Sequence, residues 1–310
     1  MRPNPARPLA WPLLLVAVMF FLATVVPATK RLSRELSPLT ISLLRYGFAV
    51  LVLVPWYARE ARRHPAHLSA GDAAVLALLG LLGIALFSFC LTAGVKMSNA
   101  SNGSLLTNSQ PIFTTLLAPL IINEEFTPLR LVGALLGLAG VALIVTGGRL
   151  SAALFRQEYF LGNLVLTGGA VAISVYTVLL KRFVIRFGGL IPTFLTMLAG
   201  SLFLAAAVLA TGSWRELAAL SPAGWLLALY VGVVGTALVY PLFNAALRSY
   251  GVVRSVGYKL LIPVFGILLG FFLLAERPAL PTLLGAAVVV GAVLLIQRTA
   301  GEQNRRNPAS

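Results

Sequence analysis

Residues 109–125 read SQPIFTTLLAPLIINEE, and residues 261–277 read LIPVFGILLGFFLLAER. Each stretch is an apolar run that begins near a proline and ends at a glutamate. A single offset of 152 residues places Pro111 on Pro263 and Glu124 on Glu276. One apolar pattern that occurs twice at a fixed spacing indicates an internal repeat, and the rest of the sequence is interpreted from that repeat.

The same offset relates rarer residue types along most of the chain. Glycine and basic positions match as well as the proline and glutamate, whereas leucine matches alone would follow from composition. Two unrelated apolar halves therefore explain the sequence less well than a duplication. The matched pairs include Lys30 with Arg182, Gly80 with Gly232, Gly83 with Gly235, Lys96 with Arg248 and Gly133 with Gly285.

The composition points to a membrane rather than to water as the solvent. Of the 310 residues, 59% are hydrophobic and 11% are charged, whereas a soluble domain carries about 25% charged residues. The net charge is +15, but the basic residues lie between apolar runs, which is typical of membrane topology and argues against a nucleic-acid partner. The single cysteine, Cys90, excludes a disulfide within the chain.

We predict ten apolar segments of about 20 residues, the length that spans a bilayer core. The first segment also has the basic start of a signal peptide, but its repeat partner favours a retained span. The segments cover residues 8–29, 38–58, 70–95, 99–122, 127–147, 158–182, 190–211, 221–248, 251–274 and 279–297.

Five segments in each repeat make the second repeat enter the membrane from the opposite side. We therefore predict an all-α integral membrane protein built from two inverted five-helix repeats, residues 1–150 and 151–298, and a disordered tail over 299–310. Inverted repeats are typical of secondary transporters. Loops on the side of the N-terminus carry roughly twice as many Lys and Arg residues, which predicts that both termini are cytoplasmic.

An ordered set of motifs accompanies the repeat. The proline-to-glutamate pattern is followed by GALLGLAG (133–140), SLLRYGFAV (42–50) contains Arg45, and VYPLFNAALRSYG (239–251) contains Tyr240. Over nearly its whole length the chain resembles the EamA-type, ten-helix branch of the drug/metabolite transporter superfamily. The resemblance implies a central cavity lined mainly by segments 1, 3, 4, 6, 8 and 9. It also implies export of amino acids or similar small metabolites, aromatic amino acids among them, across a bacterial inner membrane.

Polar residues within the apolar segments are the candidate substrate-binding residues, because polar groups at membrane depth usually face a cavity or a partner helix. The amides of the fourth segment could bind substrate or join helices, and both readings stay open. Lys259 could meet a substrate carboxylate or extend toward the headgroups. The candidates are Asn102, Asn108, Gln110, Tyr176, Tyr240, Asn244, Tyr258 and Lys259.

Other residues receive structural interpretations. Pro111 and Pro263 are expected to kink their helices and could act as hinges. Glu124 and Glu276 are expected to cap the segment that follows each of them. Arg45 is expected to extend toward the interface or to pair with a nearby carbonyl.

Groups that the sequence lacks limit the substrates and cofactors that we expect. All nine Asp and Glu residues lie at predicted helix ends or in loops, which argues against cation efflux through a buried carboxylate and favours a neutral or zwitterionic substrate. We expect no metal, cofactor or ATP site, because His64 and His67 have no matching ligands and no Walker A motif is present. A drug exporter of the same fold, a membrane enzyme or scaffold, and a homodimer packed through glycines remain alternatives.

Overall fold

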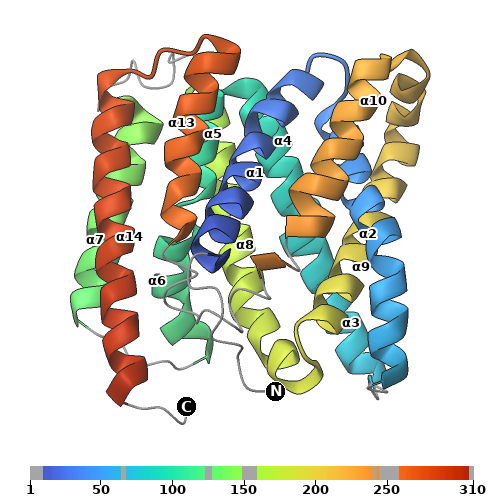
Figure 1. Cartoon of the computed structure of the whole chain (residues 1–310), viewed down its shortest axis with the longest axis horizontal. Coiled ribbons are helices and arrows are strands. Elements are labelled where there is room, and N and C mark those ends of the chain that lie inside the picture. Colours follow the sequence, from blue (N-terminus) through green and yellow to red (C-terminus); the bar gives the residue numbers. More distant parts are fainter. Residues whose placement is uncertain are drawn as a thin grey trace.

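The computed structural model describes residues 10–63, 68–122, 128–148, 159–239, 242–243 and 258–306, and all structural statements below refer to them. Every regular element among these residues is a helix (Figure 1). Each segment predicted from the sequence contains described helix. The helices are arranged side by side, with elements of the two repeats mixed rather than separated into two bodies.

The first repeat contains an interrupted third segment and an interrupted fourth segment. The third is divided by a π-helix, and the fourth is divided at residues 108–109. The elements are α1 (Ala10–Leu32), α2 (Pro38–Arg63), α3 (Ala70–Gly80), η1 (Leu81–Leu86), α4 (Phe87–Met97), α5 (Ala100–Thr107), α6 (Gln110–Ile122) and α7 (Pro128–Thr146).

The second repeat has a similar order. Its last helix continues beyond 298 to Arg306, into the segment that the sequence assigns to a tail. The elements are α8 (Phe160–Phe187), α9 (Leu190–Thr211), η3 (Ser213–Ala219), α10 (Pro222–Leu229), η4 (Tyr230–Leu238), η5 (Tyr258–Leu260), α13 (Leu261–Leu274) and α14 (Leu280–Arg306).

Length and apolarity identify a multi-pass membrane protein. Five described helices are long and apolar enough to cross a bilayer, and a sixth is added if η3 and the α10–η4 helix, bent by 119°, form one span. The fourth segment is missed by this criterion because its interruption leaves two short helices. The count of ten crossings therefore stays a prediction.

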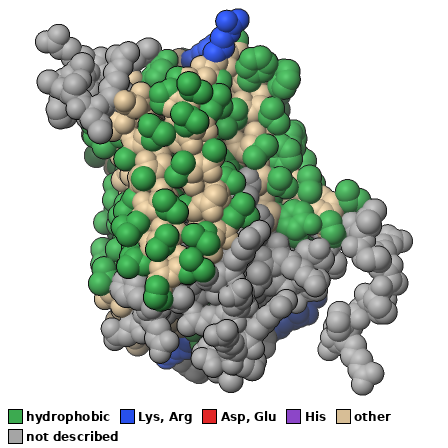
Figure 2. All heavy atoms as spheres, turned by 90° about the vertical axis from the view of Figure 1, so that its left-hand side faces the viewer, with side chains coloured by type: hydrophobic (Ala, Val, Ile, Leu, Met, Phe, Trp, Pro, Cys, Tyr) green, Lys and Arg blue, Asp and Glu red, His purple; other side chains and the backbone are tan. Residues whose placement is uncertain are grey.

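The face formed by α7 and α14 has the surface expected next to lipid. Figure 2 shows hydrophobic side chains over the described middle of this face, with Lys and Arg near its ends. Leu135 and Leu136 on α7 are about half exposed, as is Leu284 on α14. A soluble protein rarely leaves so continuous an apolar surface to water.

The set of helix contacts stays nearly the same when each helix is replaced by its counterpart in the other repeat. Two contacts join counterparts: α2 with α9, and α7 with α14. The others come in matched pairs, such as α1 with α13 and α8 with α6, or η1 with α9 and η4 with α2. This pattern is what two repeats related by a twofold axis would produce.

The two π-helices occupy equivalent positions in the repeats, since η1 plus the offset overlaps η4. Each lies where a glycine lets another helix approach. A Cβ on Gly80 would be 2.5 Å from the carbonyl oxygen of Thr196, and a Cβ on Gly232 would be 2.9 Å from that of Arg45. π-Helical insertions often occur at functional sites.

Three glycines of the helices contact side chains elsewhere in the same chain. Gly137 faces Ile112, Gly266 faces Ser104, and Gly270 faces Ser101. These glycines therefore pack inside the chain, and their contacts do not support a dimer packed through glycines.

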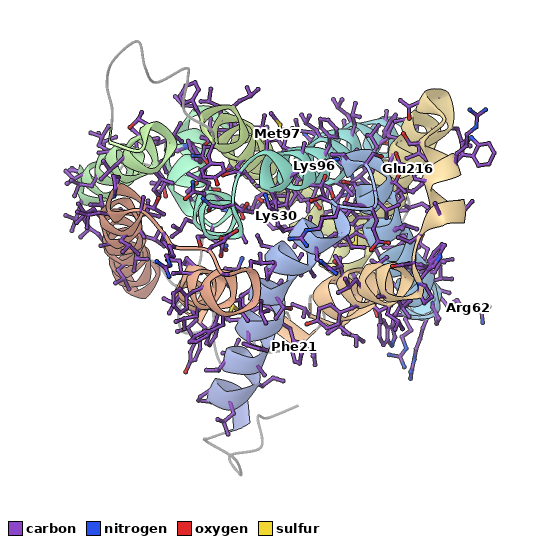
Figure 3. All side chains as sticks on the ribbon, turned by 90° about the horizontal axis from the view of Figure 1, so that it is seen from above. Phe21, Lys30, Arg62, Lys96, Met97 and Glu216 are labelled. Carbon is purple, nitrogen blue, oxygen red and sulfur yellow. The ribbon has the colours of Figure 1, made fainter. Side chains whose placement is uncertain are left out.

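Helix ends at the upper end of Figure 1 are tied together by polar contacts. Lys30 Nζ donates to the carbonyl oxygens of Val95 and Lys96 at 2.7 and 3.2 Å and to that of Ser98. Figure 3 shows Lys30 near the end of α4, where Lys96 and Met97 lie. A positive charge at the C-terminal end of a helix is favourable.

Glu276 does not cap the helix that follows it, so that prediction is wrong. Its carboxylate accepts hydrogen bonds from the backbone N–H of Ala100 at 2.7 Å and from the backbone N–H and hydroxyl of Ser101, both at 3.0 Å. It therefore caps α5 of the other repeat. Glu124 lies outside the described residues.

Two further contacts join the repeats at the same end. Glu35 accepts from the backbone N–H of Ser221 at 3.0 Å, and Glu216 accepts from that of Ser37 at 2.7 Å. The hydrogen bonds from Ser221 lower the pKa of Glu35 from its ordinary value, because they stabilise the ionised carboxylate.

Candidate functional site

A cavity of about 410 Å³ lies between the two repeats. This volume is within the range of small-molecule sites. Its lining includes every segment that the resemblance implied, and it adds Arg45 from the second segment and three valines from α14. Most of the lining is apolar, contributed by side chains such as Leu22, Phe87, Leu91, Ile173 and Phe243.

The interruption of the fourth segment places polar residues on this cavity. α5 ends at Thr107. The next helix begins after Ser109, whose carbonyl oxygen accepts from the backbone N–H of Ile112 at 2.9 Å. Thr107, Asn108 and Gln110 all line the cavity. A continuous helix would instead have directed successive side chains around its whole circumference.

Each proline lies in the first turn of a helix. Pro111 is the second residue of α6, which follows the interruption at residues 108–109, and Pro263 is the third residue of α13, which follows the short helix η5. Proline is tolerated in a first helical turn because the N–H groups there have no intrahelical acceptor. The hinge role of both prolines stays a prediction.

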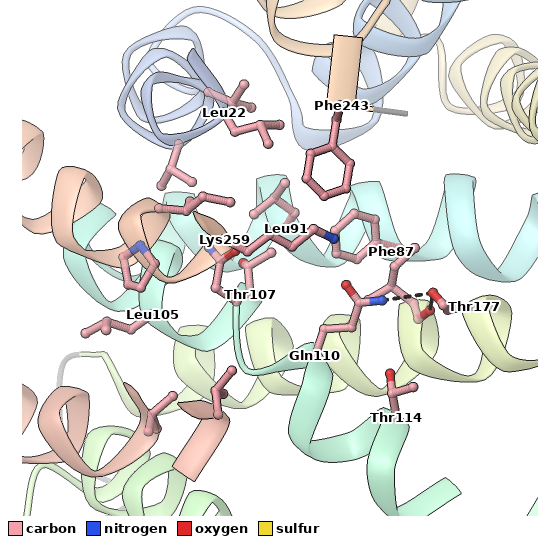
Figure 4. Close-up of a pocket in the computed structure, with 18 of the residues that line it drawn as sticks. Leu22, Phe87, Leu91, Leu105, Thr107, Gln110, Thr114, Thr177, Phe243 and Lys259 are labelled. Carbon is pink, nitrogen blue, oxygen red and sulfur yellow. Dashed lines mark hydrogen bonds between the residues drawn. The ribbon is translucent and has the colours of Figure 1, made fainter. Parts of the chain in front are cut away.

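Asn108 and Gln110 lie where they were predicted, at the cavity wall. The Nδ2 of Asn108 donates to the carbonyl oxygen of Ser104 at 2.7 Å, and the Nε2 of Gln110 donates to Oγ1 of Thr177 at 2.8 Å (Figure 4). These bonds fix both amides in place.

Three other candidates do not line the cavity. Asn102 bonds to Oδ1 of Asn163 at 3.1 Å and accepts from Thr282 at 3.3 Å, which joins three helices. Tyr176 is buried and bonds to Thr196 at 3.0 Å. Tyr258 packs against the apolar cluster around α1. Tyr240 and Asn244 lie outside the described residues.

Lys259 extends along the cavity rather than toward a headgroup region. Its Nζ lies 5.1 Å from the centre of the Phe243 ring. Figure 4 shows the side chain reaching toward Phe87 and Phe243. Lys259 is in the short helix η5 just before α13, at the position that matches Thr107 in the first repeat.

Arg45 is a second cation on the cavity wall, and it is 5% exposed. Its Nε donates to Oγ1 of Thr236 at 3.1 Å, and that hydroxyl donates to the carbonyl oxygen of Val231 at 2.9 Å. The Nη1 atom is buried and has no hydrogen-bond partner among the described residues. Arg45 was expected to extend to the interface or to pair with a nearby carbonyl, whereas its guanidinium is buried and bonds to the hydroxyl of Thr236 at the cavity.

Comparison with known proteins identifies the family of this chain. The model of the EamA-like transporter family matches residues 9–146 and again residues 160–298. The chain belongs to the EamA-like transporter family. The resemblance inferred from the sequence is confirmed, and both matches fall on the predicted repeats.

Relatives of this EamA-like transporter are named as transporters. An uncharacterized transporter of Archaeoglobus fulgidus is 26% identical over 84% of this chain and 88% of its own length. A probable terminal-alkyne amino-acid exporter of Streptantibioticus cattleyicolor is 28% identical over 78% of each chain. A solved crystal structure with 20% identity covers 94% of this chain and 97% of its own, with a TM-score of 0.60, which shows a shared fold.

The two cavity cations of the EamA-like transporter are incompletely compensated by described residues. An Arg or Lys at the centre of a membrane helix costs about 3 kcal/mol on insertion scales. A cation–π contact, which Lys259 makes with Phe243 and Arg45 makes with Tyr46, returns about 0.5–2 kcal/mol, and the hydrogen bond of Arg45 about 1 kcal/mol. The hydroxyl oxygen of Thr114, which also lines the cavity, has no partner among the described residues either.

Proposed function

We propose that this protein is a secondary exporter of amino acids or similar small metabolites. It works by alternating access between two inverted five-helix repeats that cross a bacterial inner membrane ten times, with both termini in the cytoplasm. The observation that carries the proposal is the cavity at the fourth and ninth segments, which Asn108 and Gln110 of one repeat line together with Lys259 of the other.

The exchange pattern of the helix contacts supports alternating access. Because α2 with α9 and α7 with α14 are contacts between counterparts, each repeat can adopt the arrangement of the other without forming a new kind of contact. The predicted topology puts the contacts of Glu276, Glu35 and Glu216 at the outer end. These contacts join the repeats there and support a conformation closed to the outside.

The substrate class is supported by the cavity and by one relative. A cavity of about 410 Å³ matches small-molecule sites, and its apolar walls with a few amides suit a compact organic molecule. One relative is named as a probable terminal-alkyne amino-acid exporter, and that name supports a substrate of this kind. In this proposal Lys259, Asn108 and Gln110 contact the substrate.

The test is flux in proteoliposomes loaded with radiolabelled amino acids and measured by counterflow. We expect unlabelled substrate outside to accelerate exchange of the labelled form, while liposomes without protein give no such acceleration. Lys96→Met is the matched control variant, because Lys96 is exposed at the end of α4. Flux of a cationic drug with no flux of any amino acid or related metabolite would refute the proposed substrate class.

A further inference from the structure

The cavity carries two positive charges and no negative one among its described residues. Arg45 and Lys259 are the charged residues of its lining, and they come from different repeats. Their side chains contact different residues of the second repeat: Arg45 bonds to Thr236, whereas Lys259 faces the ring of Phe243.

Four described carboxylates that could neutralise these cations are engaged elsewhere. Glu35, Glu216 and Glu276 bind backbone N–H groups at the upper end in Figure 1, and Asp72 binds Ser69 and Arg186. Among the described residues, no Asp or Glu lines the cavity. The two basic residues of the lining are therefore not balanced by a described carboxylate.

Arg45 is held in a fixed orientation toward this space. Thr236 is part of the π-helix η4. Its hydroxyl oxygen accepts a hydrogen bond from the Nε–H of Arg45, and its O–H donates to the carbonyl oxygen of Val231. The Nη1 of this cavity-lining side chain is buried and has no hydrogen-bond partner among the described residues. A guanidinium with a free N–H is well suited to bind a carboxylate, and preorganisation lowers the entropy lost on binding.

We propose that the cavity binds an organic anion, a substrate with a net negative charge and an apolar body. Its carboxylate binds Arg45, Lys259 supplies the second positive contact, and the apolar body packs against Phe87, Leu91 and Phe243. This inference deepens the proposed function and rests on it for the step of transport. It also replaces the neutral or zwitterionic substrate expected from the sequence, because the ammonium group of a zwitterion would lie in a cavity that already contains two cations.

The test compares compounds that share a phenyl group and differ in charge. Isothermal titration calorimetry on the purified full chain would measure N-acetylphenylalanine and phenylpyruvate as anions, phenylalanine as the zwitterion and phenethylamine as the cation. We expect the anions to bind at least about tenfold more tightly than phenylalanine and phenethylamine to bind most weakly. Equal or tighter binding of phenylalanine, or no binding of either anion, overturns the proposal.

Charge-removing variants test the assigned residues. We expect Arg45→Met and Lys259→Met each to weaken anion binding about 30-fold or more, because each leaves a carboxylate without its buried partner. Lys96→Met is the control, and Arg45→Lys, which retains the charge, should keep most of the anion affinity. Unchanged anion affinity in Lys259→Met and in Arg45→Met overturns the assignment, and Lys259→Met alone decides it if Arg45→Met does not fold.

The outcomes separate this inference from the proposed function. Tight binding of the anions without flux in proteoliposomes leaves the site in place and removes the transport step. Flux of phenylalanine with no preference for either anion leaves the exporter in place and removes the selectivity for net negative charge.

Discussion

The bond between Glu276 and the start of α5 gives the sharpest prediction about the conformational change, and Glu276→Gln is the perturbation that tests it. The carboxylate accepts three hydrogen bonds, from Ala100 and twice from Ser101. Glutamine keeps the shape of the side chain and one acceptor oxygen, but it removes the negative charge and the second acceptor. The variant therefore weakens the contact between the repeats without opening a cavity.

The magnitude follows from the number and kind of bonds. A hydrogen bond to a charged group contributes about 1.5–3 kcal/mol, and a negative charge at a helix N-terminus about 0.3–1 kcal/mol. Losing one charged acceptor and the charge on the other gives a weakening of about 2 kcal/mol, which corresponds to about a 30-fold increase in the open population.

Hydrogen exchange measured by mass spectrometry reports this opening directly, because the amides of Ala100 and Ser101 are the donors. We expect these amides to exchange about 30-fold faster in Glu276→Gln. The matched control is Glu35→Gln, which should accelerate exchange at Ser221 and leave the start of α5 unchanged. Equal exchange at Ala100 and Ser101 in the variant and the parent would refute the reasoning that this carboxylate holds the repeats together.

Three further predictions concern stability and pH. Gly140→Val should lower the thermal unfolding temperature by several degrees in a detergent scan, because a Cβ there would lie 3.0 Å from the carbonyl oxygen of Gly285, and a parental unfolding temperature would contradict this crossing of α7 and α14. Asn163→Leu should cost about 2 kcal/mol, since two hydrogen bonds to its side-chain oxygen are lost, and chemical unfolding that matches the parent would exclude this role. The lowered pKa of Glu35 means that its bond to Ser221 is fully present above the ordinary carboxylate pKa and is lost as the pH falls through the lowered value. Exchange at Ser221, corrected for the intrinsic rate, should therefore rise only in acid, and a rise above neutral pH would contradict this sign.

The repeat and the segment positions could be predicted because apolar length is a strong signal. Each expected segment contains helix, and the family match falls on the two halves. The sequence could also indicate that Lys259 faces a cavity, because a lysine in the middle of an apolar run has few favourable places to lie. The break at Asn108 was not predicted, because the proline after it reads equally well as a kink.

Other features depend on contacts that sequence spacing does not contain. Glu276 was assigned to the next helix because capping is usually local, yet its partners lie on α5 of the other repeat. Arg45 was expected to reach the interface because long cationic side chains commonly do so. Its actual position depends on Thr236, whose hydroxyl is presented by a π-helix that no propensity scale indicates.

The capping of α5 by Glu276 has a consequence for synthesis. The acceptor lies 176 residues after the Ala100 amide that it binds, so the ribosome completes α5 long before this acceptor exists. Asn99 accepts from the backbone N–H of Asn102, but until the α13–α14 connection is made the N–H groups of Ala100 and Ser101 must bind water or headgroups at the membrane surface. The first repeat reaches its final form only when the second is nearly complete, so the last part of the chain to be translated sets one end of a helix from its first half.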